Sequence, residues 1–432
     1  MVQRFMNRAL IATSLALLGA GCAHYTAQPL DPAVSAAALS SRQLSPGTWT
    51  LASLVEEAAS NAPEVVVARA QYATAKAAIE IAGERPNPTV ALSPQIVTPY
   101  TALIAGTYGV DFDWTFETAG KRSRRLDVAR EGENAAAAHV IDAAWKARAA
   151  VRKALLELYA AEQRGKFIEQ AIEKQAQLLT LLDERIKVGS EARSVSAQPR
   201  LLQAQLRLQA SDAAKGAALA RASLAEALGM GTNGLLGVKF SFAAFEGVPR
   251  HRTTHRMDAL THRADVLEAL ANYAAAEAAL RLEIARQYPD IHLNPGYQLD
   301  TGENKWTLGI GFTLPILNQN KGAIGEAEAK RQEAAAKFNA VQAKVLADCD
   351  RAAAAVKAAR AKIATTDQML AEQDKQLASE QRLVAAGEGD KLALLSAQVE
   401  RATTLTSRLD AMVELQAALG ALEEATQTPL AK

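Results

Sequence analysis

The stretch Tyr108-Gly-Val-Asp-Phe-Asp-Trp-Thr-Phe-Glu117 alternates apolar and polar side chains at every step. Such period-two alternation is typical of a β-strand with one apolar and one polar face. The stretch Trp306-Thr-Leu-Gly-Ile-Gly-Phe312, in the second half of the chain, repeats the pattern. Alternation of this length, with aromatic residues near the ends, favours a strand that faces lipid in a membrane β-barrel. The alternative is a soluble amphipathic hairpin packed on helices. The positions predicted to face lipid are Tyr108, Val110, Phe112, Trp114, Phe116, Trp306, Leu308, Ile310 and Phe312.

The flanking sequence is also duplicated. Asn87-Pro-Thr-Val90 is echoed by Tyr288-Pro-Asp-Ile291, and Ala58 to Val65 is echoed at the same spacing by Ala259 to Val266. A period this long fits a doubled domain better than a solenoid unit. We therefore expect two repeats, 50–234 and 257–427, joined by a linker at 235–256.

Each repeat is predicted to contain the same elements in the same order. A helix (Thr50 to about Glu84, and Met257 to about Arg286) leads into a β-hairpin at about 88–117 and 290–316, where Pro295 interrupts one strand. A long helix without proline follows at 121–188 and 321–386 and spans roughly 100 Å. A glycine-marked turn then leads to a return helix that ends at about 228 and about 426.

The second long helix carries an apolar seam whose steps of three and four residues predict coiled-coil packing. The seam consists of Phe338, Val341, Val345, Cys349, Ala352, Val356, Ala359 and Ile363, and it continues at Leu370, Leu377 and Val384. Cys349 lies inside this seam, so we expect a small core residue and not a redox or metal-binding thiol.

The N-terminus has the features of a targeting segment. Arg4 and Arg8 precede an apolar run that is too short to span a bilayer. The run ends in Leu18-Gly-Ala-Gly-Cys22, which resembles a bacterial lipobox. We expect residues 1–21 to be a signal peptide and Cys22 to be lipidated, with 22–49 following as an N-terminal segment. Ala23 after the cysteine favours the outer membrane of a Gram-negative bacterium, with the helices extending into the periplasm.

Four strands cannot span a membrane alone, because the backbone groups at open sheet edges have no partners in hydrocarbon. The sheet must therefore close with strands from other chains. Two chains would give a small barrel with a filled interior, whereas three would leave room for water. Since the polar strand positions are Gly, Thr, Asp and Glu, we expect a homotrimer with one shared pore.

The doubled layout, the two proline-containing strand starts, and the paired Arg185-to-Gly189 and Arg382-to-Gly387 turns resemble the outer-membrane factor (TolC) family. The resemblance covers essentially the whole mature chain. It implies a mixed α/β membrane protein, mostly α: a trimeric channel-tunnel with a long coiled-coil α-barrel, a twelve-stranded β-barrel (four strands per chain) and two internal repeats. It also implies a passive exit duct in contact with outer-membrane lipid, a periplasmic adaptor (membrane fusion protein) and an inner-membrane RND-type pump.

In that family the tips of the helical hairpins contact the adaptor. The resemblance assigns this role to Arg185, Gly189, Ser190, Arg382 and Gly387. Family members often carry carboxylates a few positions after the second tip glycine, where this chain has Ala393 and Ser396. Glu388 and Asp390 are therefore the possible entrance acids.

The segment Phe116-Glu-Thr-Ala-Gly-Lys-Arg122 resembles the heavy-metal, cobalt-zinc-cadmium branch of the family. This favours metal cations as cargo. Efflux of drugs or other organic solutes through the same kind of channel is one alternative. A periplasmic coiled-coil lipoprotein without a pore is the other.

Other motifs do not indicate chemistry. Gly229-Met-Gly-Thr-Asn-Gly234 matches a dinucleotide motif in letters but follows a helix and not a strand. His251, His255 and His262 lie in a basic linker without a clear ligand set. No nucleophile–base arrangement is recognisable, so we expect no enzyme, cofactor or resident metal. The net charge of +1 gives no reason to expect nucleic acid.

Overall fold

The computed structural model describes residues 25–96, 106–247, 256–300 and 302–429. The chain forms two units, Met1–Arg42 and Gln43–Lys432. In the first unit, α2 (Pro32–Ser41) is capped by Asp31, whose carboxylate accepts a hydrogen bond of 2.8 Å from the Ala33 N–H. The predicted lipidation site, Cys22, lies outside the described residues. All that follows concerns the second unit.

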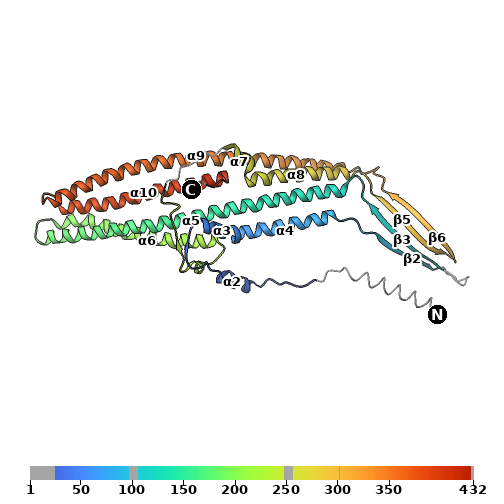
Figure 1. Cartoon of the computed structure of the whole chain (residues 1–432), viewed down its shortest axis with the longest axis horizontal. Coiled ribbons are helices and arrows are strands. Elements are labelled where there is room, and N and C mark those ends of the chain that lie inside the picture. The colour runs from blue at the N-terminus through green and yellow to red at the C-terminus, as the bar shows by residue number, and fades with distance from the viewer. Residues whose placement is uncertain (1–24, 97–105, 248–255, 301, 430–432) are drawn as a thin grey trace. The chain divides into compact units, whose positions relative to one another are not determined.

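The two predicted hairpins form a single four-stranded antiparallel sheet in the order β2-β3-β5-β6. Its strands are β2 (Thr89–Ile96), β3 (Gly106–Phe116), β5 (Ile291–Asp300) and β6 (Glu303–Phe312). The sheet lies at one end of the helices (Figure 1). The expected interruption at Pro295 affects only the pairing of β5 with β3: β5 continues through Pro295, which pairs with Leu308 of β6. The missing proline N–H affects one side of the strand alone.

The predicted long helices are confirmed as α5 (Lys121–Lys187) and α9 (Lys321–Ala385), and the return helices as α6 (Ala197–Ala227) and α10 (Lys391–Thr426). A short 3₁₀ turn, η1 (Arg193–Ser196), precedes α6. Both long helices start from a left-handed residue, Gly120 with φ 70° and Asn320 with φ 58°. Glycine and asparagine adopt this conformation most readily.

The predicted single helix ahead of each hairpin is wrong in both repeats, because each is broken in two. The first repeat has α3 (Leu51–Asn61) and α4 (Pro63–Gly83), and the second has α7 (Arg256–His262) and α8 (Ala264–Ala285). Pro63 explains the first break, since the residue before a proline is driven to extended backbone and Ala62 has ψ 137°. The second break has no proline, and Arg263 has ψ 140° there.

The helices lie side by side, with different neighbours at the two ends (Figure 1). Next to the sheet, α8 packs between α5 and α9, and α4 packs on the other side of α5. Toward the turns, α10 takes the place of α8 and α6 takes the place of α4. The two long helices therefore run the full length, while the shorter ones divide it between them.

The predicted seam of α9 is confirmed as a core. Val345, Cys349, Val356 and Ile363 are buried against α10, with Phe338 and Val341 partly buried beside them. Cys349 donates through its thiol to the Ala425 carbonyl at 3.4 Å, as a packed small residue. A second core gathers around Leu155 of α5, with Leu54, Val65 and Leu224.

The segment between the repeats contains two short elements in its described part. After α6 it forms η2 (Thr232–Leu235), which overlaps the glycine-rich motif, and then β4 (Lys239–Phe240), which pairs in parallel with β1 (Thr48–Trp49). Phe245 is fully buried against Tyr159. Gln416 of α10 donates to the Gly247 carbonyl at 2.7 Å. His251 and His255 lie outside the described residues, and His262 ends α7.

Among the helices of the described ranges, none combines the length and the hydrophobicity needed to cross a bilayer.

We expect Phe245→Ala to loosen the segment between the repeats, because removing a buried phenylalanine costs about 3–5 kcal/mol. Limited proteolysis of the detergent-solubilised protein should then cut between Leu236 and Arg256 at least tenfold faster. The control is Leu236→Ala in the same segment, whose side chain is exposed. Equal cleavage rates for the two variants would show that Phe245 is not the anchor.

Candidate functional site

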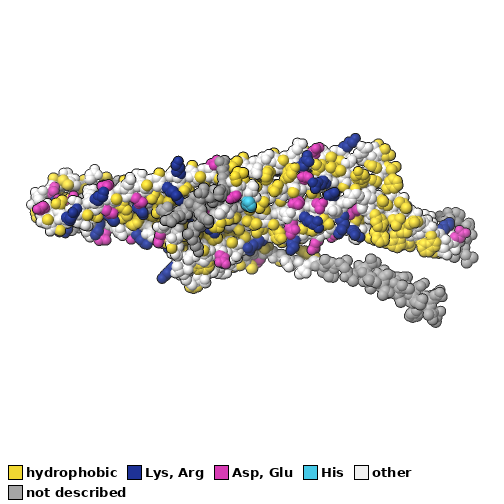
Figure 2. All heavy atoms as spheres, turned by 45° about the horizontal axis from the view of Figure 1, so that its top comes forward, with side chains coloured by type: hydrophobic (Ala, Val, Ile, Leu, Met, Phe, Trp, Pro, Cys, Tyr) yellow, Lys and Arg dark blue, Asp and Glu magenta, His cyan; other side chains and the backbone are white. Residues whose placement is uncertain are grey.

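The register of the sheet places the apolar residues of all four strands on one face. Val90 lies opposite Phe112, Trp114 opposite Leu293, and Leu293 opposite Ile310. Figure 2 shows hydrophobic side chains covering the strand end of the molecule. Of the nine residues predicted to face lipid, all lie on this face and all but the half-buried Val110 are exposed: Tyr108, Phe112, Trp114, Phe116, Trp306, Leu308, Ile310 and Phe312.

The opposite face of the sheet is polar and internally hydrogen-bonded. Ser93 donates to Asp111 at 3.2 Å, and His292 lies 3.1 Å from Asp113. Gly296 leaves room for the Asp111 carboxylate, because a Cβ there would lie 2.4 Å from its oxygen. The sheet therefore has one face suited to an apolar surrounding and one suited to water.

The junction between strands and helices is held by the segment that resembles the heavy-metal branch. Thr118 donates from its N–H to Asp290 at 3.0 Å and from its hydroxyl to the Pro289 carbonyl at 2.6 Å. The buried Lys121 forms an ion pair with Asp290 at 2.7 Å. Since Asp290 precedes β5, these contacts connect the first repeat to the second.

Arg122 of this segment and Arg125 just after it also cap the end of α4. Arg125 pairs with Glu117 and donates to the Glu84 carbonyl at 2.9 Å, and Arg122 donates to the Gly83 carbonyl at 2.6 Å. The last carbonyls of a helix have no partner inside the helix, so these arginines satisfy them. The residues of this motif therefore build the junction.

At the far end, the first hairpin turns at Gly189, which has φ 78°. Ser190 closes the turn by donating from its N–H and its hydroxyl to the Arg185 carbonyl, at 3.0 and 2.9 Å. The predicted tip residues of this hairpin thus form one compact turn.

The second hairpin turns at Gly387, with φ 77°. Gly389 is also required, because a Cβ there would lie 2.6 Å from the Val384 nitrogen and 2.8 Å from the Leu383 carbonyl carbon. Arg382 donates to the Ala378 carbonyl of its own helix at 3.2 Å, and Glu388 is exposed.

The two tips are joined by an ion pair that the sequence did not reveal. Both terminal guanidinium nitrogens of Arg185 donate to the carboxylate of Asp390, Nη1 at 3.0 Å. Asp390 also caps α10 by accepting from the Leu392 N–H at 2.9 Å. The hydrogen bonds from Arg185 and Leu392 hold the pKa of Asp390 below its usual range. Of the two predicted entrance acids, one is therefore already paired with a predicted adaptor contact.

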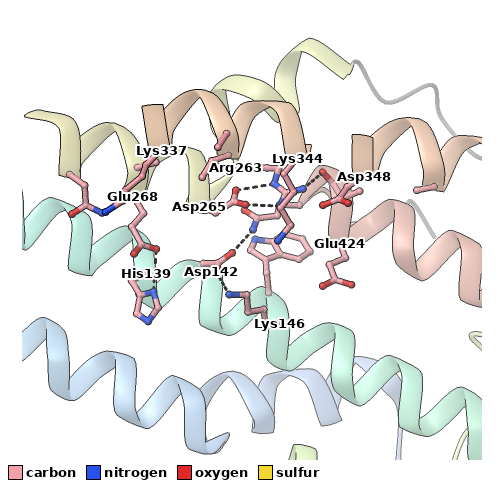
Figure 3. A pocket seen from close by; sticks show the side chains of 18 of the residues that line it. His139, Asp142, Lys146, Arg263, Asp265, Glu268, Lys337, Lys344, Asp348 and Glu424 are labelled. Carbon is pink, nitrogen blue, oxygen red and sulfur yellow. Dashed lines mark hydrogen bonds and ion pairs between the residues drawn. The ribbon is translucent and has the colours of Figure 1, made fainter. Parts of the chain in front are cut away.

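An open groove of about 1370 Å³ lies where α10 ends and α8 begins, between α5 and α9 (Figure 3). Gln427 bridges this joint: its carbonyl accepts from the Ala264 N–H at 2.7 Å and its amide donates to Asp142 at 3.1 Å. Arg263 donates to the Ala425 carbonyl at 2.7 Å.

Several charged residues of the groove are paired with one another. Lys146 lies 2.6 Å from Asp142, a hydrogen bond that raises the pKa of Lys146, and His139 lies 3.1 Å from Glu268. Throughout the described residues, no three His, Cys, Asp or Glu side chains stand together in a way that would hold a metal ion. The groove is a joint between stacked helices with balanced charge.

Sequence reasoning missed Asp290, Gly389 and Gln427. In the sequence Asp290 stands out only as part of the strand start at 288–291, although a carboxylate just before a strand is a candidate partner for a cationic side chain. The second glycine in the longer second tip was the available signal for Gly389. Nothing in the sequence marks Gln427, because its partners come from helices far apart in the chain.

Comparison with known proteins agrees with this architecture. Residues 54–230 and 256–427 match the family model described as Outer membrane efflux protein. The cobalt-zinc-cadmium resistance protein CzcC of Cupriavidus metallidurans is 24% identical over 223 residues, which cover 50% of this chain and 53% of that protein. The match thus spans about half the length of that curated relative.

Solved structures share the fold at low sequence identity. The outer-membrane channel OprN superposes with a TM-score of 0.72 at 18% identity, covering 88% of this chain and 90% of that one. CusC superposes with a TM-score of 0.72 at 17% identity, covering 87% of this chain and 91% of that one. VceC from Vibrio cholerae superposes with a TM-score of 0.69 at 22% identity, covering 87% of this chain and 95% of that one. With the sheet, the paired helical hairpins and the family match in agreement, this chain belongs to the outer membrane efflux protein family.

Proposed function

We propose that this chain forms the outer-membrane channel of a tripartite efflux system. Three copies would close their sheets into one twelve-stranded barrel and continue it as a helical tunnel into the periplasm. The channel itself is a passive duct, and an inner-membrane RND-type pump delivers the substrate through a periplasmic adaptor. Lipid on Cys22 would anchor each chain in the outer membrane.

The observation that carries this proposal is the sheet. It exposes one continuous apolar face and ends in two strands, β2 and β6, each of which is hydrogen-bonded on one side only among the residues that the structure describes. An apolar surface of this kind is expensive in water, and an open edge is expensive in lipid. Closure with other copies inside a membrane removes both costs.

Heavy-metal cations are the proposed cargo. The similarity to a cobalt-zinc-cadmium resistance protein supports this assignment. The motif at 116–122 supports it only as a sign of relationship, because its side chains are engaged in the junction. A channel for organic solutes would have the same fold, so an experiment on the transported substrate distinguishes the two.

The tips around Gly189 and Gly387 are the proposed adaptor contacts, together with Arg185, Ser190 and Arg382. The ion pair between Arg185 and Asp390 would hold the two hairpins of each chain together there. Glu388 is then the remaining candidate for an acidic entrance.

Ile310→Arg should block assembly, because an arginine at the centre of the lipid-facing band costs about 2–4 kcal/mol per chain. Semi-native gels of outer-membrane fractions should show loss of the trimer. Gln298→Arg, on the polar face of β5, is the matched control and should assemble. Normal insertion of Ile310→Arg would refute the barrel.

The cargo is tested by deleting the gene for this chain in its native host. Growth should become at least several-fold more sensitive to cobalt, zinc or cadmium salts, and expression of the chain should restore it. Sensitivity to cationic dyes and detergents, measured in parallel, should change little. The reverse pattern would assign organic solutes to the same channel.

Asp390→Asn should separate the two tips while keeping the helix cap, which asparagine also provides. Because the pKa of Asp390 is lowered, the pair is complete above the ordinary aspartate range and is lost only as pH falls through the lowered value. Spin labels at Lys187→Cys and Glu388→Cys should report one distance from pH 8 down through the ordinary aspartate pKa of about 3.9, and the distribution should broaden only at lower pH.

In Asp390→Asn, the distribution should be broad at every pH. Asp374→Asn is the control, because Asp374 pairs with Arg401 within one hairpin. Equal distance distributions for the labelled protein with and without Asp390→Asn would show that the Arg185–Asp390 pair does not hold the two tips together.

A further inference from the structure

The segment that follows β6 is unusually apolar for an exposed connection. Leu314, Ile316 and Leu317 are 63%, 75% and 102% exposed. No charged residue occurs between Phe312 and Lys321, where α9 begins. In a single chain surrounded by water, these three side chains would stabilise nothing.

The junction does not need them. On this side, Asn320 performs the local bonding: its side-chain amide donates to the Glu283 carbonyl at 2.8 Å, and its N–H donates to Asn318 at 2.9 Å. The corresponding connection of the first repeat, Glu117 to Gly120, makes the same transition with polar and small residues. An apolar sequence is therefore not a requirement of the strand-to-helix turn.

The segment continues directly from the apolar face of the sheet. Trp306, Leu308, Ile310 and Phe312 occupy that face at every second position, and Phe312 is the last paired residue. The chain then turns, and the Ile316 N–H donates to the Leu314 carbonyl at 2.9 Å. Phe312 pairs with Ile291, so this end of β6 lies beside the start of β5, which the exposed Tyr288 precedes. In Figure 2 the hydrophobic surface extends from the strands onto the adjoining helix ends.

We propose that Leu314, Ile316 and Leu317 form an apolar collar that inserts among the phospholipid acyl chains of the periplasmic leaflet. The inference rests on the proposed function, since it requires the sheet to span the outer membrane. It extends the lipid-facing surface beyond the strands to the level of Lys321. A tyrosine and a lysine at this boundary are typical of the headgroup region, where amphipathic side chains reach from acyl chains to water.

A neighbouring copy is the competing occupant, because β6 is an edge strand of the sheet. Edge partners approach in the plane of the sheet, through backbone groups. Leu314, Ile316 and Leu317 lie beyond Phe312, the last paired residue of β6, in a turn in which the Ile316 N–H donates to the Leu314 carbonyl. Continuity with the apolar face therefore favours lipid over a second copy.

The test uses nitroxide labels on the full-length protein in phospholipid vesicles. Cys349→Ala removes the buried thiol, and the proposed lipid occupies the thiol of Cys22, so the introduced cysteine is the labelled position in each variant. Labels at Leu317→Cys are compared with Ile310→Cys in the middle of the strand band and Glu328→Cys on the exposed surface of α9. Collision rates are measured with oxygen, which concentrates in lipid, and with a water-soluble nickel chelate.

The label at Leu317→Cys should collide more often with oxygen than with nickel, as at Ile310→Cys, whereas Glu328→Cys should show the reverse. A water-like label at 317 beside a lipid-like label at 310 overturns the collar and leaves the channel standing. Low collision rates with both reagents at 317 assign the segment to a subunit contact and also overturn the collar. A water-like label at 310 overturns the barrel, and the collar with it.

Discussion

Backbone hydrogen bonding at the two edges of the sheet is the constraint on which the rest of the molecule depends. In the described part of one chain, β2 and β6 each have a single neighbouring strand, although the apolar face between them is suited to hydrocarbon. Hydrocarbon offers no partner for a free N–H or carbonyl group, so such a sheet is stable there only as part of a closed barrel. The proposed trimer follows from this constraint, and so does the need for both repeats to contribute strands to one sheet.

The repeats solve the same structural problems with different chemistry. At the start of the long helices, one repeat uses Gly120 and the other uses Asn320 in the same left-handed conformation. At the tips, the first turn is closed by Ser190, whereas the second requires the close approach of Gly389 to its own backbone. The ion pair between Arg185 and Asp390 connects the tip of the first repeat to the tip of the second. Backbone geometry has thus been kept between the repeats while side-chain interactions have diverged.

The distribution of charge distinguishes junctions from surfaces. Lys121, Arg125 and Asp290 are engaged in the contact between strands and helices, and in the groove beside Gln427 Asp142 pairs with Lys146. These interactions hold elements together and leave no set of free ligands in the described part of the chain.

Local pattern was enough to predict the alternating strands, the length of α5 and α9, the buried position of Cys349 and the polar character of one sheet face, because each depends on the spacing of neighbouring residues. Pro63 also carried the signal for a broken helix, which the prediction overlooked. Other features depend on residues that are distant in the chain. They are the Arg185–Asp390 ion pair, the Lys121–Asp290 ion pair and the burial of Phe245. Only the tertiary structure decides such contacts, because the spacing along a chain does not specify which helix faces will meet.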